Sequence, residues 1–419
     1  MNRTVLVHLM TSSRDRSEAI ESMAELEDLA RAAGARIARK VFQTRASPDP
    51  RTFIGGGKVE EIKGILRETG ADLVLFDQDM KPSQQRSLEQ ALEARVIDRT
   101  QLILDIFARR ARTTEGKLQV ELAQLTYLLP RLTGKGKALS RLGGGIGTRG
   151  PGETKLETDR RRIEARIARI RREVRSVAGR RAGQRRSRKE SLIRTAALVG
   201  YTSVGKTTLF NRLAGESAFT SPQLFATLDP LVRRTALPDG LPYFISDTVG
   251  FVKRLPPALL SSFKATLEEV LEAGLILHVI DLSAPNAEAQ AASVEKTLAE
   301  IGARGIPTIR IYNKIDRLPD RRALLARNEI ETESVYLSAV TGEGLPALKS
   351  RIRALLFEGL RVFYIRVPHD REDIWASLEK RSLILKRREG AGHLEARVMA
   401  EPSRLIDLAA YIVSGEPTW

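Results

Sequence analysis

The segment Gly200-Tyr201-Thr202-Ser203-Val204-Gly205-Lys206-Thr207 decides the fold. An apolar run at 196–199, predicted as a buried parallel strand, precedes it, and residues 208–213 predict the start of a helix. In this context the spacing G-x-x-x-x-G-K-[ST] predicts a phosphate-binding loop, and the alternative is a chance match in a glycine-rich turn. The glycines allow backbone N–H groups to point at phosphate oxygens, and the helix N-terminus adds positive charge.

Four further motifs follow in chain order, and the last of them is residues 335–339 (VYLSA), a strand and a loop that could cap the base. Residues 225–230 (FATLDP) contain Thr227, which can reach a metal ion. Strand 241–246 leads to residues 247–250 (DTVG), where Asp247 suits Mg²⁺ and the Gly250 N–H suits a γ-phosphate. Residues 313–316 (NKID) follow a strand, and Asp316 can accept hydrogen bonds from N1–H and N2 of guanine, which adenine does not offer.

Together the five motifs predict a GTP-binding domain. The predicted nucleotide-binding residues are Gly200, Tyr201, Thr202, Ser203, Val204, Gly205, Lys206, Thr207, Thr208, Phe225, Thr227, Asp247, Gly250, Asn313, Lys314, Asp316, Ser338, Ala339 and Val340. We expect Thr207, Thr227 and Asp247 to hold Mg²⁺. The predicted catalytic groups for water attack on the γ-phosphate are Lys206, Thr227 and Gly250.

Composition limits the remaining classes of protein. The 419 residues suggest about three domains, and no apolar run reaches the length of about 18 residues expected of a membrane-spanning helix. The N-terminus lacks the apolar core of a signal peptide. There is no cysteine and only four histidines, which excludes disulfides and disfavours a zinc site. We therefore expect a soluble cytoplasmic protein, monomeric by default.

The net charge of +17 is concentrated in one segment. Residues 131–190 hold 20 Lys and Arg against 6 Asp and Glu. This asymmetry predicts a polyanionic partner, either RNA or an anionic membrane. An apolar helix stripe without Trp or Phe argues against the membrane.

Four segments are expected. Residues 1–112 alternate strand and helix signals and predict a small α/β domain with a parallel sheet. Within it, residues 53–58 (FIGGGK) predict a tight strand-to-helix turn or a nucleotide or RNA contact, and only weakly a catalytic nucleotide site. The GTPase domain is predicted over 193–357. A small α/β C-terminal domain without a catalytic cluster is predicted over 358–419.

Residues 113–192 predict a basic helical hairpin. Leucines at 118, 122, 125 and 129, and apolar residues at 156, 163, 167, 170 and 174, form two stripes with helical spacing. The interruption at 134–152 is too rich in glycine to be helical. RNA-binding candidates are Lys135, Lys137, Arg141, Arg149, Lys155 and Arg160, and the alternative is a solvated basic coil. Residues 180–189 are predicted as a loose linker.

The chain resembles the HflX family of GTPases over nearly its whole length. The resemblance rests on the five nucleotide motifs, on residues 131–134 (RLTG), and on 139–160 (LSRLGGGIGTRGPGETKLETDR). Residues 53–59 and 82–86 resemble the N-terminal domain of that family. Phe251 stands where a Ras-like enzyme has a water-orienting Gln, a hydrophobic replacement that the family shares. Gly274 departs from the usual Asp of the family.

The resemblance implies a GTPase that binds the large ribosomal subunit and its rRNA and splits stalled ribosomes. Slow intrinsic hydrolysis, stimulated by the ribosome, is then expected. A different hypothesis is an RNA-remodelling or large-subunit assembly factor, with additional ATP-dependent activity at the N-terminal glycine-rich loop.

Overall fold

The computed structural model describes residues 3–12, 16–132, 151–190, 193–215, 231–252 and 269–413. The side chains of 151–156 and 178–190 lie outside this description. The chain divides into two compact units. Within the described ranges no helix is long and apolar enough to span a membrane.

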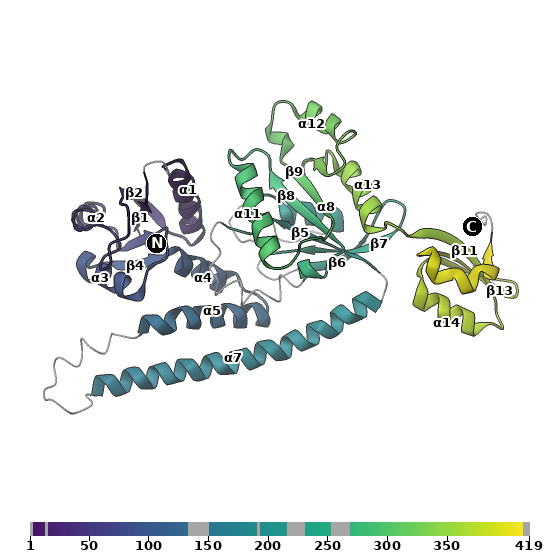
Figure 1. Cartoon of the computed structure of the whole chain (residues 1–419), viewed down its shortest axis with the longest axis horizontal. Helices are drawn as coiled ribbons and strands as arrows, with labels where there is room; N and C mark the ends of the chain where they lie inside the picture. Colours follow the sequence, from purple (N-terminus) through teal and green to yellow (C-terminus); the bar gives the residue numbers. More distant parts are fainter. Residues whose placement is uncertain are drawn as a thin grey trace. The chain divides into compact units, whose positions relative to one another are not determined.

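The first unit is built on a four-stranded parallel sheet with the order β2-β1-β3-β4 (Figure 1). The strands are β1 (Arg3–Met10), β2 (Arg36–Thr44), β3 (Leu73–Phe76) and β4 (Arg95–Asp98). The helices are α1 (Arg16–Ala32), α2 (Gly56–Thr69), α3 (Pro82–Leu92) and α4 (Arg99–Arg110). Side chains alternate across each strand, so Val5 and Val7 join the core formed with α2 and α3. The predicted parallel α/β domain is confirmed.

Two helices form the predicted hairpin, α5 (Thr114–Leu132) and α7 (Pro151–Glu190). The first unit includes α7 as far as Val177. Arg166 of α7 donates two hydrogen bonds to Glu121 of α5, at 2.7 and 2.8 Å. The predicted leucine stripe of α5 is half-buried. Val120, Ala123 and Tyr127, which lie outside that stripe, are buried instead. Because α5 also contacts α3 and α4, one of its faces belongs to the sheet domain.

The prediction of a loose linker at 180–189 was wrong, because α7 continues to Glu190. Arg, Lys, Gln, Glu and Ala dominate this stretch and have strong helix propensity. The start of the helix also differs from prediction. Pro151 and Gly152 were assigned to the loop, but Pro151 is the first helical residue, a position where the missing N–H of proline costs nothing.

The second unit contains a six-stranded sheet with the order β10-β9-β8-β5-β7-β6. Its strands are β5 (Thr195–Gly200), β6 (Leu231–Ala236), β7 (Pro242–Asp247), β8 (Leu275–Asp281), β9 (Thr308–Asn313) and β10 (Ser334–Tyr336). Its helical segments are α8 (Lys206–Ala214), α11 (Ala287–Glu300), η2 (Ile315–Arg317), α12 (Arg321–Arg327) and α13 (Leu345–Leu356). The sequence did not predict β6, which pairs antiparallel with β7 at the edge.

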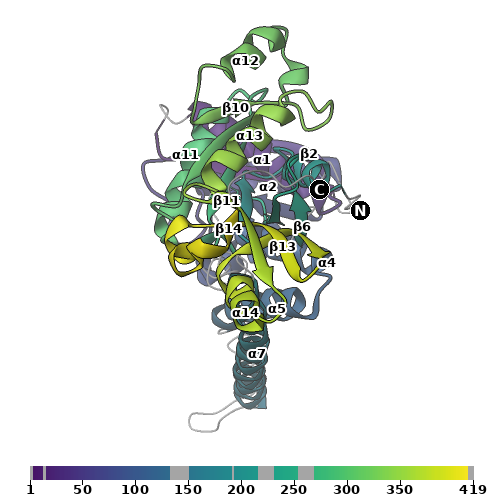
Figure 2. The same ribbon diagram turned by 90° about the vertical axis from the view of Figure 1, so that its right-hand side faces the viewer.

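A smaller antiparallel sheet follows in the same unit, with the order β12-β13-β11-β14. Figure 2 shows three of its strands, β11, β13 and β14. Its elements are β11 (Arg361–Pro368), α14 (Glu372–Arg381), β12 (Leu383–Gly390), β13 (His393–Ala400), the 3-10 helix η3 (Pro402–Tyr411) and β14 (Ile412–Val413). The predicted small α/β C-terminal domain is therefore present.

His278 makes the stability of the central sheet sensitive to acid. It lies in β8, is 1% exposed, and neither ring nitrogen has a hydrogen-bond partner among the described residues. Glu295 is 3.9 Å from Nδ1, beyond hydrogen-bond range. Burial, with the positive charges of Arg310 and Lys206, lowers the pKa of His278 to about 4.

We expect stability to fall as the pH drops from about 6.5 towards 4, by at most about 3 kcal/mol from this group. In this window the unfolded chain binds a proton that the folded chain does not. The free energy of unfolding, measured with denaturant at several pH values in this window, should fall less steeply with decreasing pH for His278→Leu than for the wild type. His369→Leu, at an exposed histidine, is the control. Equal slopes for His278→Leu and wild type would contradict this account.

Candidate nucleotide-binding site

The predicted phosphate loop lies at the carboxyl end of β5, tightly packed against the ends of β8 and β9. A Cβ on Gly200 would lie 2.3 Å from the carbonyl oxygen of Val279. Gly205 has a φ of 98°, and a Cβ there would lie 2.4 Å from Asn313 Nδ2. Neither position accommodates a side chain, so both glycines are required by the local geometry.

Lys206 begins α8 and is almost completely buried. Its Nζ donates to the carbonyl oxygens of Gly200 and Tyr201, at 3.0 and 2.7 Å. Burial lowers the pKa of the ammonium group to about 8, although the carboxylate of Asp247 acts in the opposite direction. The cation is therefore fixed inside the loop at a cost in solvation that an anionic ligand can offset.

Thr207 and Asp247 meet beside the loop. Thr207 Oγ1 donates to Asp247 Oδ2 at 2.8 Å, and Asp247 is fully buried at the end of β7. A hydroxyl and a carboxylate oxygen are hard donors of the type that Mg²⁺ prefers. Thr227 and Phe225, the other predicted contacts of this region, lie outside the described residues.

The segment after Asp247 packs directly on the phosphate loop. Phe251 N–H donates to Gly200 O at 3.1 Å, and Thr202 N–H donates to Phe251 O at 2.8 Å. A Cβ on Gly250 would lie 3.2 Å from Lys206 Nζ and 2.8 Å from Thr202 Cγ2. These two hydrogen bonds, named here the Phe251 bridge, bring Gly250 close to the cation that is predicted to bind phosphate.

The side chains of the 313–316 motif divide into two sets. Asn313 Nδ2 donates to Val204 O at 2.8 Å, and Lys314 Nζ donates to Ser203 O at 2.7 Å. These two side chains therefore brace the phosphate loop, a contact that the sequence analysis did not include. Asp316 does not take part. Its Oδ1 is buried and has no hydrogen-bond partner among the described residues, which fits an acceptor for guanine.

The loop at 338–340 is held next to this motif. Asn313 Oδ1 accepts a hydrogen bond from Ala339 N–H at 3.0 Å. Arg212 of α8 donates to the carbonyl oxygens of Ala339 and Val340. Ser338 is buried, whereas the side chain of Val340 is 63% exposed. The structure thus brings the predicted base-capping loop beside Asn313.

Two side chains of the site were not predicted from sequence. Asp281 Oδ2 accepts a hydrogen bond from Lys314 Nζ at 2.6 Å, and Arg212 orders the 338–340 loop. Asp281 had a usable signal, since it closes the strand beside β9 and parallel strands end at one edge of the sheet. Arg212 had none, because its partners are backbone carbonyl groups far away in the sequence.

The remaining predicted residues lie elsewhere. Lys135, Lys137, Arg141 and Arg149 are outside the described residues, as is the side chain of Lys155. Arg160, on α7, donates to Glu164 at 3.0 Å. The predicted tight strand-to-helix turn at 53–58 is not seen, because residues 45–55 separate β2 from α2 and residues 56–58 form the start of α2. Gly55 N–H donates to Gln43 Oε1, and Lys58 pairs with Glu61.

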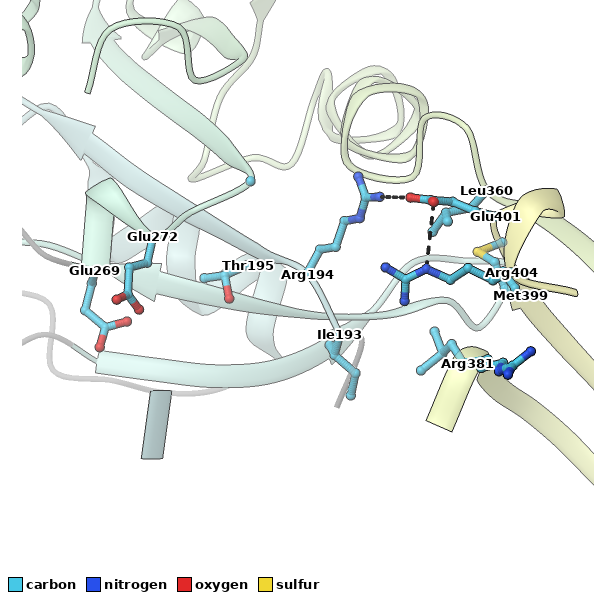
Figure 3. A pocket seen from close by; sticks show the side chains of 13 residues that line it. Ile193, Arg194, Thr195, Glu269, Glu272, Leu360, Arg381, Met399, Glu401 and Arg404 are labelled. Atoms are coloured by element: carbon cyan, nitrogen blue, oxygen red, sulfur yellow. Dashed lines mark ion pairs between the residues drawn. The ribbon is translucent and has the colours of Figure 1, made fainter. Parts of the chain in front are cut away.

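A separate pocket of about 270 Å³ lies between the start of β5 and the C-terminal sheet (Figure 3). Arg194 and Arg404 both approach Glu401 there, at 3.9 and 3.8 Å. Gly274 lines this pocket and donates its N–H to Thr195 O, at the opposite end of β5 from the phosphate loop. The unusual glycine is therefore remote from the nucleotide motifs.

A phosphate loop between a central parallel strand and its helix, braced by an NKID motif, defines the class of P-loop GTPases. Three family profiles match the chain. They are described as GTP-binding GTPase N-terminal (residues 20–108), GTP-binding GTPase Middle Region (110–188) and 50S ribosome-binding GTPase (195–314).

Individual relatives agree with these profiles. The GTPase HflX of Alkalihalophilus pseudofirmus is 46% identical over 372 residues, or 89% of this chain and 87% of the relative. That of Escherichia coli is 45% identical over 368 residues, or 87% and 85%. The chain therefore belongs to the HflX family of GTPases, as its motifs suggested, and it hydrolyses GTP.

Among solved structures, that of SsGBP in complex with GDP is 24% identical, with a TM-score of 0.46. The match covers 85% of this chain and 98% of SsGBP.

Proposed function

We propose that this GTPase binds the large ribosomal subunit when GTP is bound and thereby dissociates stalled ribosomes. In this proposal the loop at 200–208 binds the phosphates, Asp316 reads guanine, and the 338–340 loop covers the base. The protein acts in the cytoplasm as a monomer, and no membrane takes part.

The Phe251 bridge is the observation that carries the proposal. It brings Gly250 against Lys206 and Thr202, where the γ-phosphate of GTP is expected to bind. Entry of that phosphate therefore requires the segment to move, whereas GDP has no group at this position. A segment with two arrangements, one for each nucleotide, is what a nucleotide-controlled partner interaction needs.

Thr207 and Asp247 fit a Mg²⁺ ion because both offer oxygen donors. Thr227, which lies outside the described residues, is proposed as a third ligand from its sequence motif. When bound, the ion neutralises charge on the β- and γ-phosphate oxygens. Lys206 and the N–H of Gly250 stabilise the same region from the protein side. Phe251 has no polar group to orient a water molecule, so hydrolysis is slow until the ribosome supplies or orders one.

The basic segment supports an RNA partner. Its 20 cations among residues 131–190 favour a phosphate-rich surface, for which rRNA is the proposed source. Several cations on α7, including Arg160, Arg161, Arg166 and Arg169, already pair with acidic side chains. Exposed ion pairs of this kind are weak, so the contact with rRNA is assigned to all six candidates, Lys135, Lys137, Arg141, Arg149, Lys155 and Arg160.

Sucrose-gradient sedimentation tests the proposal. Whole ribosomes are mixed with the protein and a non-hydrolysable GTP analogue, GDP or an ATP analogue. We expect only the GTP form to sediment with the large subunit and to reduce the peak of whole ribosomes, because only the γ-phosphate opens the Phe251 bridge.

The Lys296→Ala variant removes an exposed lysine of α11, away from the nucleotide motifs, and should split ribosomes as the wild type does. Sedimentation at the top of the gradient with every nucleotide, at low salt, would refute ribosome binding. Binding without splitting would leave the assembly-factor hypothesis standing in its place.

A further inference from the structure

The C-terminal domain has one covered and one open sheet face. Its elements follow the order strand, helix, two strands, 3-10 helix, strand, with the antiparallel strand order β12-β13-β11-β14. This is the split β-α-β arrangement of ferredoxin-like domains. Leu378 of α14, with Leu405 and Leu408 of η3, packs against Ile365 and Val398 of the sheet. Both helical segments thus cover the same face.

The strand register places the other side chains in rows on the opposite face, named here the open face. Lys386, Arg397 and Tyr364 are neighbours in one row, across β12, β13 and β11. Arg388, Glu395 and Arg366 form the next row. Lys386, Arg388 and Arg366 are exposed, and Tyr364 and Arg397 are half-buried. The open face thus carries four cations, one carboxylate and a central aromatic ring.

The open face carries more cations than carboxylates, and one ion pair between them is described here. Arg366 donates to Glu395 Oε1 at 3.0 and 2.7 Å, and this contact lowers the pKa of the Glu395 carboxyl group. Arg397 Nε is buried and has no hydrogen-bond partner among the described residues. A buried guanidinium N–H of this kind is normally satisfied, so an acceptor from a ligand would complete it.

The helical side of the same domain differs in charge. Arg371 donates to Asp373 at 2.9 and 2.8 Å, and Arg381 donates to Asp407 at 3.1 Å. Residues 371–381 and 402–411, which include the two helical segments, together hold four Lys and Arg and four Asp and Glu, so their formal charges balance. The excess of positive charge is specific to the open face and does not merely follow from the basic composition of the chain.

We propose that the open face binds single-stranded RNA. In this arrangement a base stacks on Tyr364, and the cations of the two rows contact phosphates or base edges. Four-stranded sheets that carry an aromatic side chain among cations suit unpaired nucleotides, because every base offers a face for stacking. A protein partner fits less well, because Leu383 and Met399, the apolar residues at one end of this face, are buried and line the pocket of Figure 3.

Binding of a short unstructured RNA oligonucleotide to the full-length protein with GDP tests the proposal. Fluorescence anisotropy should show a loss of affinity of about tenfold for Tyr364→Ala, whereas Tyr364→Phe should stay near wild type because it keeps the ring. Lys386→Ala should reduce the slope of log affinity against log salt by about one. Lys380→Ala, at an exposed lysine of α14, should leave affinity and slope unchanged.

Ultraviolet crosslinking followed by mass spectrometry locates the RNA and separates this face from the basic hairpin. Crosslinks to β11 or β13 are expected. Crosslinks confined to 131–190 would overturn the proposal, as would wild-type affinity of Tyr364→Ala. If Tyr364→Ala does not fold, the Lys386→Ala and Arg388→Ala double variant decides in the same assay. Equal affinity for the matching DNA oligonucleotide would overturn the choice of RNA.

Discussion

Replacing Asp316 with Asn is expected to reduce GTP affinity by about 10²- to 10³-fold. The carboxylate accepts two hydrogen bonds from guanine, whereas an Asn side chain would turn its NH₂ group towards the guanine amino group. The buried, unpartnered Oδ1 of Asp316 indicates that no protein group in the described structure competes for this carboxylate.

The same change should raise the affinity for xanthosine triphosphate. Xanthine has a carbonyl oxygen where guanine has its amino group. The NH₂ group of Asn can donate a hydrogen bond to this oxygen, whereas the carboxylate of Asp repels it. Competition of both nucleotides against a fluorescent GTP analogue measures the reversal. Asp320→Asn, at an exposed carboxylate nearby, should change neither affinity. A parallel loss for both nucleotides would show that Asp316 acts on folding and does not read the base.

The Lys206→Ala variant should lose about 10²- to 10³-fold in GTP turnover while remaining folded. The ammonium group is the buried cation of the loop, and its loss leaves the phosphate charge without its main protein partner. Single-turnover hydrolysis measures the rate of GTP cleavage, and titration with labelled GTP measures the affinity for the nucleotide. Lys296→Ala serves as the charge-matched control.

Stability should change little in Lys206→Ala, and this separates function from folding. Burial lowers the pKa of Lys206 to about 8, so the charged form is disfavoured in the nucleotide-free protein by about 3 kcal/mol at neutral pH. Removing the group relieves that penalty but leaves a small cavity and the carbonyl of Tyr201 without its partner. A melting temperature far below that of wild type would contradict this balance.

Local spacing was sufficient to predict much of this molecule. The phosphate loop, the Asp247 segment and the NKID motif are short, contiguous and each follow an apolar strand, so their positions at the sheet edge follow from the parallel order of the strands. The C-terminal domain was predicted for a similar reason, since its strands and helices have clear periodicity.

What could not be predicted depends on contacts distant in sequence. The Phe251 bridge joins two backbone segments, and backbone hydrogen bonds leave no signature in side-chain types. Asn313 and Lys314 brace a loop more than a hundred residues away. The antiparallel edge strand β6 has Arg233 and Arg234 in place of a continuous apolar run. Helix α7 was cut short in prediction because its charged end resembles a linker.

The Phe251 bridge couples the affinity for GTP to the affinity for a binding partner. Opening it gives up two hydrogen bonds, each worth about 1 kcal/mol, before the γ-phosphate can enter. A partner that binds only the open segment removes this cost and strengthens GTP binding, by a factor of about 30 if the full 2 kcal/mol is recovered. By linkage, GTP must strengthen binding of that partner by the same factor, so one coupling free energy sets both affinities.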